Sequence, residues 1–297
     1  MLALSDVTLT FPDGASRVTA VHRASLTVPS GTITGVTGPS GSGKSSLLAL
    51  ASTLVTPDSG SVSIAGIRTT GLSPAETAAL RREKVGIVFQ QANLLPSLTA
   101  AEQVRVMAEL TPASGADGRA RHGRSGEERH NRNSERNGES GERHGRGNGL
   151  GRGCGSRSSQ EDGRERGRGA GRRARRTRAE ELLELVGLAD HRRARPHALS
   201  GGQQQQVNIA RALMCEPDVL IVDEPTSALD SARSREIVEL LLEVTRTLGT
   251  ATLLVTHDVE FLPLFDRTLT MTDGELRAER PLMSHSTSTN GPFTDVE

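Results

Sequence analysis

The 297-residue sequence has no Trp, no Tyr, five Phe and only two Cys, and these scarcities exclude several classes of protein. Cys154 and Cys215 are too widely separated to suggest a disulfide framework or a cysteine metal site, and they suit a reducing compartment. No run approaches the roughly 20 apolar residues that span a bilayer, and the first residues lack a basic region followed by an apolar one. The sequence therefore predicts a soluble chain, and any membrane part of its function would belong to another polypeptide.

The charge is zero overall but unevenly distributed. Between Arg119 and Arg178 there are 18 Arg against 8 Asp and Glu, and residues 111–178 hold 16 of the 32 Gly with almost no large apolar side chains. Such a composition cannot bury enough surface to offset the entropy cost of ordering the chain. We therefore predict a disordered Arg/Gly-rich insert over 111–178. It interrupts a single domain formed by residues 1–110 and 179–280, and a loose Ser/Thr-rich tail follows over 281–297.

Outside these segments apolar strands alternate with amphipathic helices, which indicates an α/β fold with a mostly parallel sheet. Ser73, Pro74 and Glu76 have the spacing of a helix N-cap with a capping box. The expected strands are 7–11, 25–28, 32–37, 85–89, 219–222, 252–255, 267–271 and 275–277, and the expected helices are 44–54, 179–188, 203–215, 232–248 and a short one near Phe261.

A phosphate-binding loop lies between the strand over 32–37 and the helix over 44–54. It fits the pattern G-x-x-x-x-G-K-[ST] and consists of Gly38, Pro39, Ser40, Gly41, Ser42, Gly43, Lys44 and Ser45, followed by Ser46. Its backbone N–H groups would surround the phosphates of a nucleotide, Lys44 would reach the β- and γ-phosphates, and the Ser45 hydroxyl would bind Mg²⁺. Lys44 is one of only two lysines in a chain that otherwise uses Arg, and its compact charge suits a phosphate site.

Two further segments predict phosphate chemistry. Ser200, Gly201, Gly202 and Gln203 form a turn that leads into a helix, which makes a second site for an anion. The apolar strand over 219–222 delivers Asp223 and Glu224 at its carboxyl end, where ligands bind in parallel α/β sheets. Asp223 would hold Mg²⁺ and Glu224 would act as the general base toward the attacking water.

These motifs, with residues 225–230 directly after Glu224, resemble those of the ATP-binding subunits of ABC transporters. The resemblance covers nearly everything outside the insert. It implies a P-loop NTPase fold of the ABC type, with a RecA-like mixed sheet core, an antiparallel β subdomain and a helical subdomain that carries Ser200–Gln203. It also implies four roles, listed here: Gln90 contacts Mg²⁺ and takes part in catalysis, His257 holds the γ-phosphate, Phe11 stacks on adenine, and Asp230 belongs to the nucleotide-binding set.

The same resemblance implies partners. Ser200 and Gly202 would contact ATP bound to a second subunit, in a head-to-tail dimer with two ATP molecules between the subunits, most simply a homodimer. The dimer would drive separate transmembrane permease subunits through a groove near Gln90, from the cytoplasmic face of the cell membrane. Residues 88–100 resemble the lipoprotein-release, macrolide-efflux and cell-division ATPases, which favours export or lipoprotein and peptide extraction.

The sequence departs from the family pattern in the helix that follows Ser200–Gln203 and in the insert, and these departures leave alternatives open. Gln206 stands where Arg is usual, and Asn208 is polar where a small apolar residue is common. The insert could be a tolerated loop, because each doubling of loop length costs only about 0.6 kcal/mol. It could also attract anionic headgroups or bind RNA. The lack of aromatic side chains in it counts against RNA, so no specific nucleic acid is expected. The alternative functions are a non-transport ABC ATPase that acts on RNA or ribosomes, and a mechanotransmission ATPase of the cell-division type.

Overall fold

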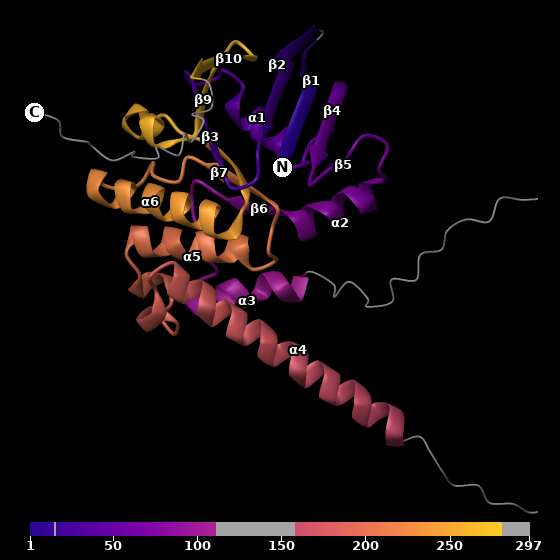
Figure 1. Cartoon of the computed structure of the whole chain (residues 1–297), viewed down its shortest axis with the longest axis vertical. Coiled ribbons are helices and arrows are strands. Elements are labelled where there is room, and N and C mark those ends of the chain that lie inside the picture. The colour runs from indigo at the N-terminus through magenta and orange to yellow at the C-terminus, as the bar shows by residue number, and fades with distance from the viewer. Residues whose placement is uncertain (15, 111–157, 281–297) are drawn as a thin grey trace, which may run out of the picture. The chain divides into compact units, whose positions relative to one another are not determined.

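The computed structural model describes residues 1–14, 16–110 and 158–280 (Figure 1). The tail over 281–297 and the part of the predicted insert over 111–157 lie outside the described residues. Of the described residues, 1–110 and 172–280 belong to one compact unit, which holds both sheets. Of the second unit, residues 113–171, the described part is the beginning of one helix.

A six-stranded sheet forms the centre of the first unit. Its order is β10-β9-β3-β8-β7-β6, and β9, β3, β8, β7 and β6 are parallel whereas β10 is antiparallel to β9. The strands are β3 (Ile33–Thr37), β6 (Val85–Val88), β7 (Val219–Asp223), β8 (Ala251–Val255), β9 (Arg267–Thr272) and β10 (Glu275–Arg280). The central strands are apolar at nearly every position because helices or a second sheet cover both faces of the sheet. The prediction of a mostly parallel sheet in an α/β fold is confirmed.

A separate antiparallel sheet has the order β2-β1-β4-β5. Its strands are β1 (Leu2–Asp13), β2 (Ser16–Val28), β4 (Ser59–Ile64) and β5 (Ile67–Arg68). The hairpin β1–β2 is longer than predicted, and irregular register in its middle lets the two strands bend while remaining paired. Near the tip of this hairpin Phe11 lies directly opposite Val18.

Three short 3-10 helices lie in the described ranges, at Ala189–His191, Pro196–Ala198 and Val259–Leu264. Six α-helices complete the described chain: α1 (Lys44–Ala51), α2 (Pro74–Lys84), α3 (Ala100–Leu110), α4 (Ser158–Leu185), α5 (Gly201–Leu213) and α6 (Ser231–Leu248). The capping box predicted for Ser73 and Glu76 is confirmed at the start of α2. Helix α3 was not predicted. Its start has the same kind of cap, because the Thr99 N–H donates to Glu102 Oε2 at 2.9 Å and the Glu102 N–H donates to Thr99 Oγ1 at 3.4 Å.

Helix α4 corrects the prediction for the insert. We expected disorder over 111–178 and a helix only over 179–188, but the helix begins at Ser158, so the prediction is wrong over 158–178. Arg favours helix, and residues 158–178 contain eight Arg against four Gly. Pairs such as Arg176–Glu180 at 3.0 Å add a few tenths of a kcal/mol each. The buried face at Leu182 and Leu183 anchors the end of the helix.

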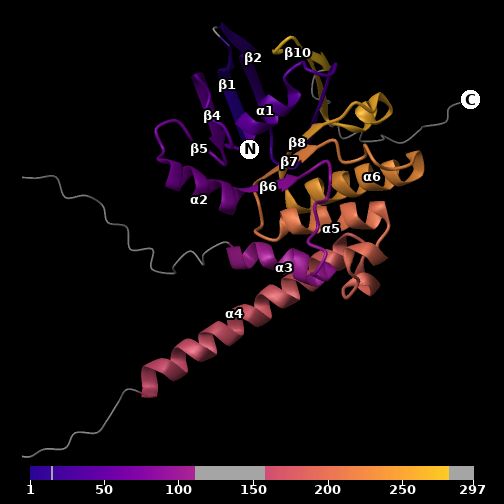
Figure 2. The ribbon, with the colours of Figure 1, turned by 180° about the vertical axis from the view of Figure 1, so that it is seen from behind.

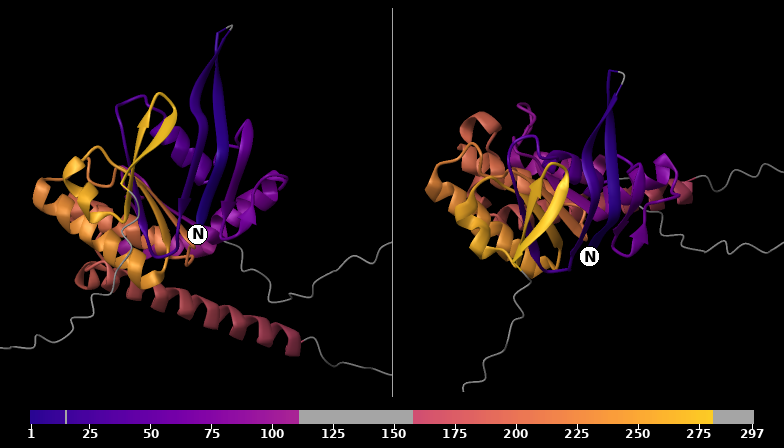
Figure 3. Two further views of the ribbon diagram at one scale, coloured as in Figure 1. Left: turned by 45° about the horizontal axis from the view of Figure 1, so that its top comes forward. Right: turned by 90° about the horizontal axis from the view of Figure 1, so that it is seen from above.

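The central sheet separates two apolar cores. On β7, Val219 and Ile221 belong to the core shared with α1 and the antiparallel sheet, whereas Leu220 and Val222 belong to the core shared with α3, α4, α5 and α6. The alternation follows from the two-residue period of a strand. Figures 1 and 2 show helices α3 to α6 on the side of the central sheet away from the antiparallel sheet, and Figure 3 gives two further views of this layering. No helix in the described ranges has the length and apolar character that crossing a membrane requires.

Candidate functional site

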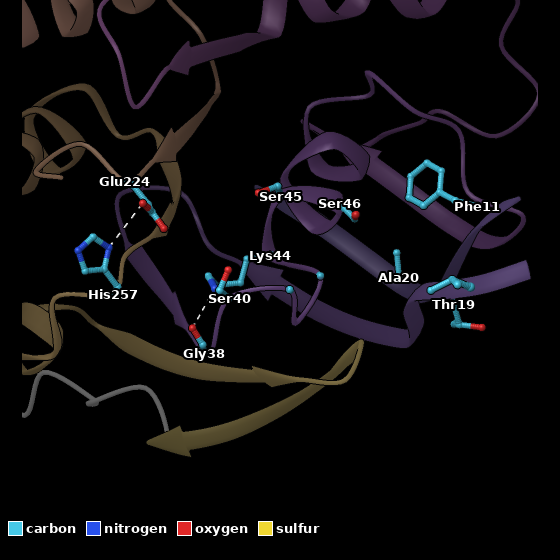
Figure 4. A pocket seen from close by; sticks show the side chains of 13 residues that line it. Phe11, Thr19, Ala20, Gly38, Ser40, Lys44, Ser45, Ser46, Glu224 and His257 are labelled. Atoms are coloured by element: carbon cyan, nitrogen blue, oxygen red, sulfur yellow. Dashed lines mark hydrogen bonds and ion pairs between the residues drawn. The ribbon is translucent and has the colours of Figure 1, made fainter. Parts of the chain in front are cut away.

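The predicted site segments meet at one edge of the central sheet. The phosphate-binding loop follows β3, Gln90 follows β6, Glu224 follows β7 and His257 follows β8, all at the carboxyl ends of parallel strands. A cavity of about 550 Å³ opens at this edge (Figure 4). It is lined by Phe11, Val18, Thr19, Ala20, Gly38, Ser40, Gly41, Gly43, Lys44, Ser45, Ser46, Glu224 and His257.

The loop that follows β3 is shaped by glycines that no other residue could replace without strain. Gly38 has φ 146° and Gly43 has φ 102°, a region that side chains strongly disfavour. A Cβ on Gly38 would collide with the carbonyl oxygen of Met271, and a Cβ on Gly43 would collide with that of Ala20. The buried Ser42 hydroxyl has no hydrogen-bond partner in the structure. The loop is therefore packed closely against neighbouring backbone at its glycines, and the Ser42 hydroxyl in it is unpaired.

Lys44 places its charge inside this loop. Its Nζ atom donates to the carbonyl oxygens of Gly38 and Pro39, both at 2.8 Å. Lys44 is also the first residue of α1, and Ser45 and Ser46 follow it at the mouth of the cavity. An ammonium group and the positive end of a helix together favour a phosphate ligand.

Glu224 joins three loops that lie far apart in the sequence. Its Oε2 atom accepts a hydrogen bond from Gln90 Nε2 at 3.3 Å. The same atom lies 3.5 Å from His257 Nδ1, as Figure 4 shows. Its backbone has φ 41°, the left-handed region, and its N–H donates to the carbonyl oxygen of Val255 at 2.9 Å. The structure thus brings the three predicted catalytic residues to one point. A carboxylate held at this edge can accept a proton from a water molecule.

Asp223 is the last residue of β7 and is half-buried. Burial raises the pKa of the Asp223 carboxyl, the neighbouring charge of Glu224 raises it further, and the charge of Lys44 opposes both effects. Asp223 and Glu224 carry two negative charges beside the single positive charge of Lys44, so a further cation would be electrostatically favoured here. The Ser45 hydroxyl, the Asp223 carboxylate and the Gln90 amide offer the oxygen ligands that Mg²⁺ prefers.

We expect Asp223→Asn to raise the melting temperature of the chain without added nucleotide or Mg²⁺. The pKa of Asp223 is raised in the folded state, so the ionised carboxylate destabilises the folded chain at neutral pH. The uncharged amide of asparagine does not have this destabilising effect. The gain should shrink as the pH falls and should vanish below about pH 4, where the carboxyl is protonated in both states. Calorimetric scans of both chains across this range give the measurement. A lower melting temperature for the variant at neutral pH would contradict the prediction.

The cavity extends to an apolar wall that sequence reasoning found only in part. Phe11 is 43% exposed and lines the cavity, as expected for a residue that stacks on a base. Val18, Thr19 and Ala20 line it as well and were missed. Val18 could have been found from the hairpin, because the turn that follows Phe11 pairs the two positions once the register is known.

Asp258 and Thr226 form a second contact that was missed. The Thr226 hydroxyl donates to Asp258 Oδ2 at 2.6 Å, and Asp258 Oδ1 lies 3.6 Å from His257 Nε2. The segment after Glu224 is thereby tied to the loop that carries His257. The signal was the place of Asp258 directly after His257, at the end of a predicted strand.

The second predicted anion site lies apart from this cavity in the single chain. Ser200 is the N-cap of α5: its hydroxyl accepts from the Gln203 N–H at 3.3 Å, and Gln203 Oε1 accepts from the Ser200 N–H at 2.9 Å. Asp230 caps α6 in the same way, accepting from the Arg233 N–H at 3.0 Å. Of the described residues that line the cavity, none belongs to 200–203 or is Asp230. Ser200 and Gly201 are exposed and Gly202 is buried.

Comparisons with known proteins give one consistent family. A family model described as ABC transporter matches residues 21–227. The chain is 36% identical over 270 residues to the macrolide export ATP-binding/permease protein MacB of Rhodopseudomonas palustris (strain HaA2), which covers 91% of this chain and 32% of that protein. It is 35% identical over 279 residues to the methionine import ATP-binding protein MetN 1 of Salmonella choleraesuis (strain SC-B67), covering 93% of this chain and 64% of that protein. The chain thus spans less than two thirds of the length of these curated relatives.

Similar solved structures belong to the same family of ABC transporter cassettes. A dimeric structure of MJ0796, a bacterial ABC transporter cassette, has a TM-score of 0.66 and 32% identity, covering 94% of this chain and 97% of that chain. A dimeric post-hydrolysis state of the same cassette bound to ADP and Pi has a TM-score of 0.67 and 31% identity, covering 95% of this chain and 100% of that chain.

Proposed function

Because the chain belongs to the ABC transporter family, we propose that it binds and hydrolyses ATP to drive membrane permease subunits. The observation that carries the proposal is the meeting of Gln90, Glu224 and His257 beside the phosphate-binding loop that contains Lys44. Each of these groups has a role in phosphoryl transfer, and the proposal assigns the roles residue by residue.

The phosphates of ATP would lie in the loop Gly38–Ser46. Lys44 would exchange its two carbonyl partners for oxygens of the β- and γ-phosphates, and the backbone N–H groups of the loop would hold the rest. Ser45, Asp223 and Gln90 would hold Mg²⁺, whose charge would offset that of the phosphates. The raised pKa of Asp223 supports this set, since a cation beside the carboxylate would stabilise its ionised form.

Hydrolysis would depend on Glu224 as the general base. Gln90 and His257 already contact its Oε2 atom, so all three side chains would surround the water that attacks the γ-phosphate. Glu224 would accept a proton from that water, and His257 would donate a hydrogen bond to the γ-phosphate. Asp258 would orient His257 from its other ring nitrogen.

Phe11→Ala should weaken ATP binding by about 5- to 150-fold, because a stacked base contributes about 1–3 kcal/mol. Phe11→Tyr keeps the ring and should bind ATP as the unchanged chain does. Fluorescence titration with a labelled ATP analogue measures both affinities. Equal binding by the alanine variant would remove Phe11 from the nucleotide site.

The segment Ser200–Gln203, in which Ser200 and Gly201 are exposed, supports a dimer. Because these residues do not line the cavity of their own chain, they would contact the γ-phosphate of ATP held by a second subunit, and Asp230 would lie at the same interface. A homodimer is the simplest arrangement, since the chain carries both halves of such a site. ATP binding would close the dimer and hydrolysis would open it.

A second cavity supports a membrane partner. It has a volume of about 470 Å³, lies beside the loop that carries Gln90, and is lined by Arg81, Arg82, Val85, Gly86, Ile87, Phe89, Asn93, Met107, Leu110, Arg211, Ala212 and Cys215. Phe89 and Leu110 are exposed there, which suits an apolar segment of a permease. The chain would then work at the cytoplasmic face of the cell membrane, in an export or extraction system.

Capture from membranes tests the partner. Glu224→Gln should hold ATP with Mg²⁺ in the closed dimer, and a tagged variant should retain a permease that mass spectrometry identifies. Lys44→Ala, which should not close, is the matched control. Recovery of ribosomal proteins or RNA without a membrane protein would contradict the proposal and favour the RNA-acting alternative.

A further inference from the structure

Asn208 lies fully buried in α5, eight residues beyond the N-cap Ser200. Its Nδ2 atom donates to the carbonyl oxygen of Phe89 at 2.8 Å and lies within 3.3 Å of Gln205 Oε1. Its Oδ1 atom accepts from Arg211 Nη2 at 2.7 Å. Both ends of the amide are therefore bonded, as burial of a polar group requires. The polar residue that departs from the family pattern is thus a fully satisfied link between a helix and a loop.

Arg211 extends this link along the same loop. Its Nη2 atom also donates to the carbonyl oxygen of Ala92 at 2.8 Å, and its Nη1 atom donates to that of Asn93 at 3.4 Å. Gln205 Nε2 adds a longer bond to the Phe89 carbonyl oxygen at 3.3 Å. The backbone is held by α5 on both sides of Gln90, immediately before it and two residues after it.

We propose that Asn208 is a positioning residue for Gln90, fixing residues 89–93 to the helix that begins at Ser200. The inference rests on the proposed function, because Gln90 matters only if it serves catalysis at Glu224. Asn208 does not line the cavity, and its hydrogen bonds go to Phe89, Gln205 and Arg211. It acts by holding the Phe89 carbonyl and by orienting the guanidinium that holds Ala92.

These contacts explain why a small apolar residue at position 208 could not hold residues 89–93 as Asn208 does. Alanine at position 208 would leave the Phe89 carbonyl with the longer bond from Gln205, and it would remove one acceptor from the half-buried Arg211. A lost bond to a charged group weakens the link more than a neutral one would. Residues 89–93 would then sample positions in which Gln90 Nε2 no longer reaches Glu224.

The same link joins two sites of the proposed dimer. Ser200 and Gln203 are at the start of α5 and Asn208 is on its third turn, so one rigid helix carries both the exposed capping box and the anchor of the Gln90 loop. A shift of α5 caused by ATP on a second subunit would move Gln90 with it. Asn208 therefore transmits dimer closure to the Gln90 side of the cavity.

A double-mutant cycle with Asn208→Ala and Gln90→Ala tests this. Asn208→Ala should lower kcat about 5- to 10-fold, which corresponds to the loss of one ordinary hydrogen bond from the positioning of Gln90. It should raise the Mg²⁺ concentration needed for half-maximal rate and leave the affinity for ATP without Mg²⁺ unchanged. In the Gln90→Ala background it should have no further effect on kcat. Gln206→Ala, on the same helix but near Gly187, is the matched control and should leave kcat unchanged.

Hydrogen exchange of the nucleotide-free chain gives a readout that does not depend on activity. Asn208→Ala should accelerate exchange in peptides that contain residues 89–95 and leave peptides from β3 and β8 unchanged. Effects on kcat that multiply in the double variant, or exchange that is unchanged over 89–95, would overturn the inference. An inactive unmodified chain would instead count against the proposed function, and the exchange result would still stand.

Discussion

Glu224→Gln is expected to slow steady-state ATP hydrolysis by about 10²- to 10⁴-fold, the usual contribution of a general base. Glutamine keeps the size of the side chain and an oxygen that can accept from Gln90, so the geometry around the cavity should persist. What it loses is the ability to take a proton from water. Phosphate release by the purified chain with ATP and Mg²⁺ measures the effect.

The same variant should bind ATP at least as tightly as the unchanged chain, because hydrolysis no longer empties the site. Size-exclusion chromatography with ATP and Mg²⁺ should then reveal a dimer that the unchanged chain forms only briefly. Glu243→Gln is a matched control, since Glu243 is exposed on α6 and distant in sequence from the cavity residues. A rate within about threefold of normal for Glu224→Gln would assign the base to another residue.

Lys44→Ala is expected to weaken ATP binding by about 100-fold. Each hydrogen bond from a charged group contributes about 1.5–3 kcal/mol, and Lys44 would make at least one to the phosphates. Burial and the charge of Glu224 raise the pKa of the Asp223 carboxyl, and the Lys44 ammonium lowers it. Removing the ammonium would leave the phosphates facing two carboxylates. Calorimetric titration with ATP, with and without Mg²⁺, measures the loss.

Lys84 provides an unusually close control, because it is the only other lysine of the chain. It pairs with Asp218 at 2.9 Å at the far end of β7 from the cavity, so Lys84→Ala should bind ATP normally. Lys44→Arg should recover only part of the affinity, since the planar guanidinium is wider than an ammonium. Unchanged binding by Lys44→Ala would show that the loop holds phosphate through its backbone alone.

Much of the site could be predicted because its determinants are local. The phosphate loop, the strand before it and the helix after it form one continuous pattern, and Asp223 and Glu224 follow an apolar strand directly. The cap of α2 depends on four consecutive residues. In each case neighbours in the sequence supply the hydrogen bonds, so a single segment contains the information.

What escaped prediction depends on contacts between distant segments. The pairing of Val18 with Phe11 follows from hairpin register, and the bond from Asn208 to Phe89 joins residues 119 positions apart. Helix α3 escaped for a different reason: its cap at Thr99 and Glu102 is a local signal that was not used. The early start of α4 was not predicted because the segment contains several glycines. Each glycine destabilises a helix by about 1 kcal/mol, and the composition therefore indicated disorder despite the surrounding Arg and Glu.

The backbone conformation of Glu224 determines which substitutions at this position change the side chain without also changing the backbone strain. A left-handed φ of 41° is unfavourable for every residue with a Cβ, so glutamine or alanine inherits the same conformational penalty and glycine escapes it. Glycine at this position should therefore yield a chain that melts at a higher temperature and cannot turn over ATP. Selection for durability alone would have removed the carboxylate. Glycine would relax the backbone but remove the carboxylate, so the conformational cost and the proposed catalytic role fall on the same residue.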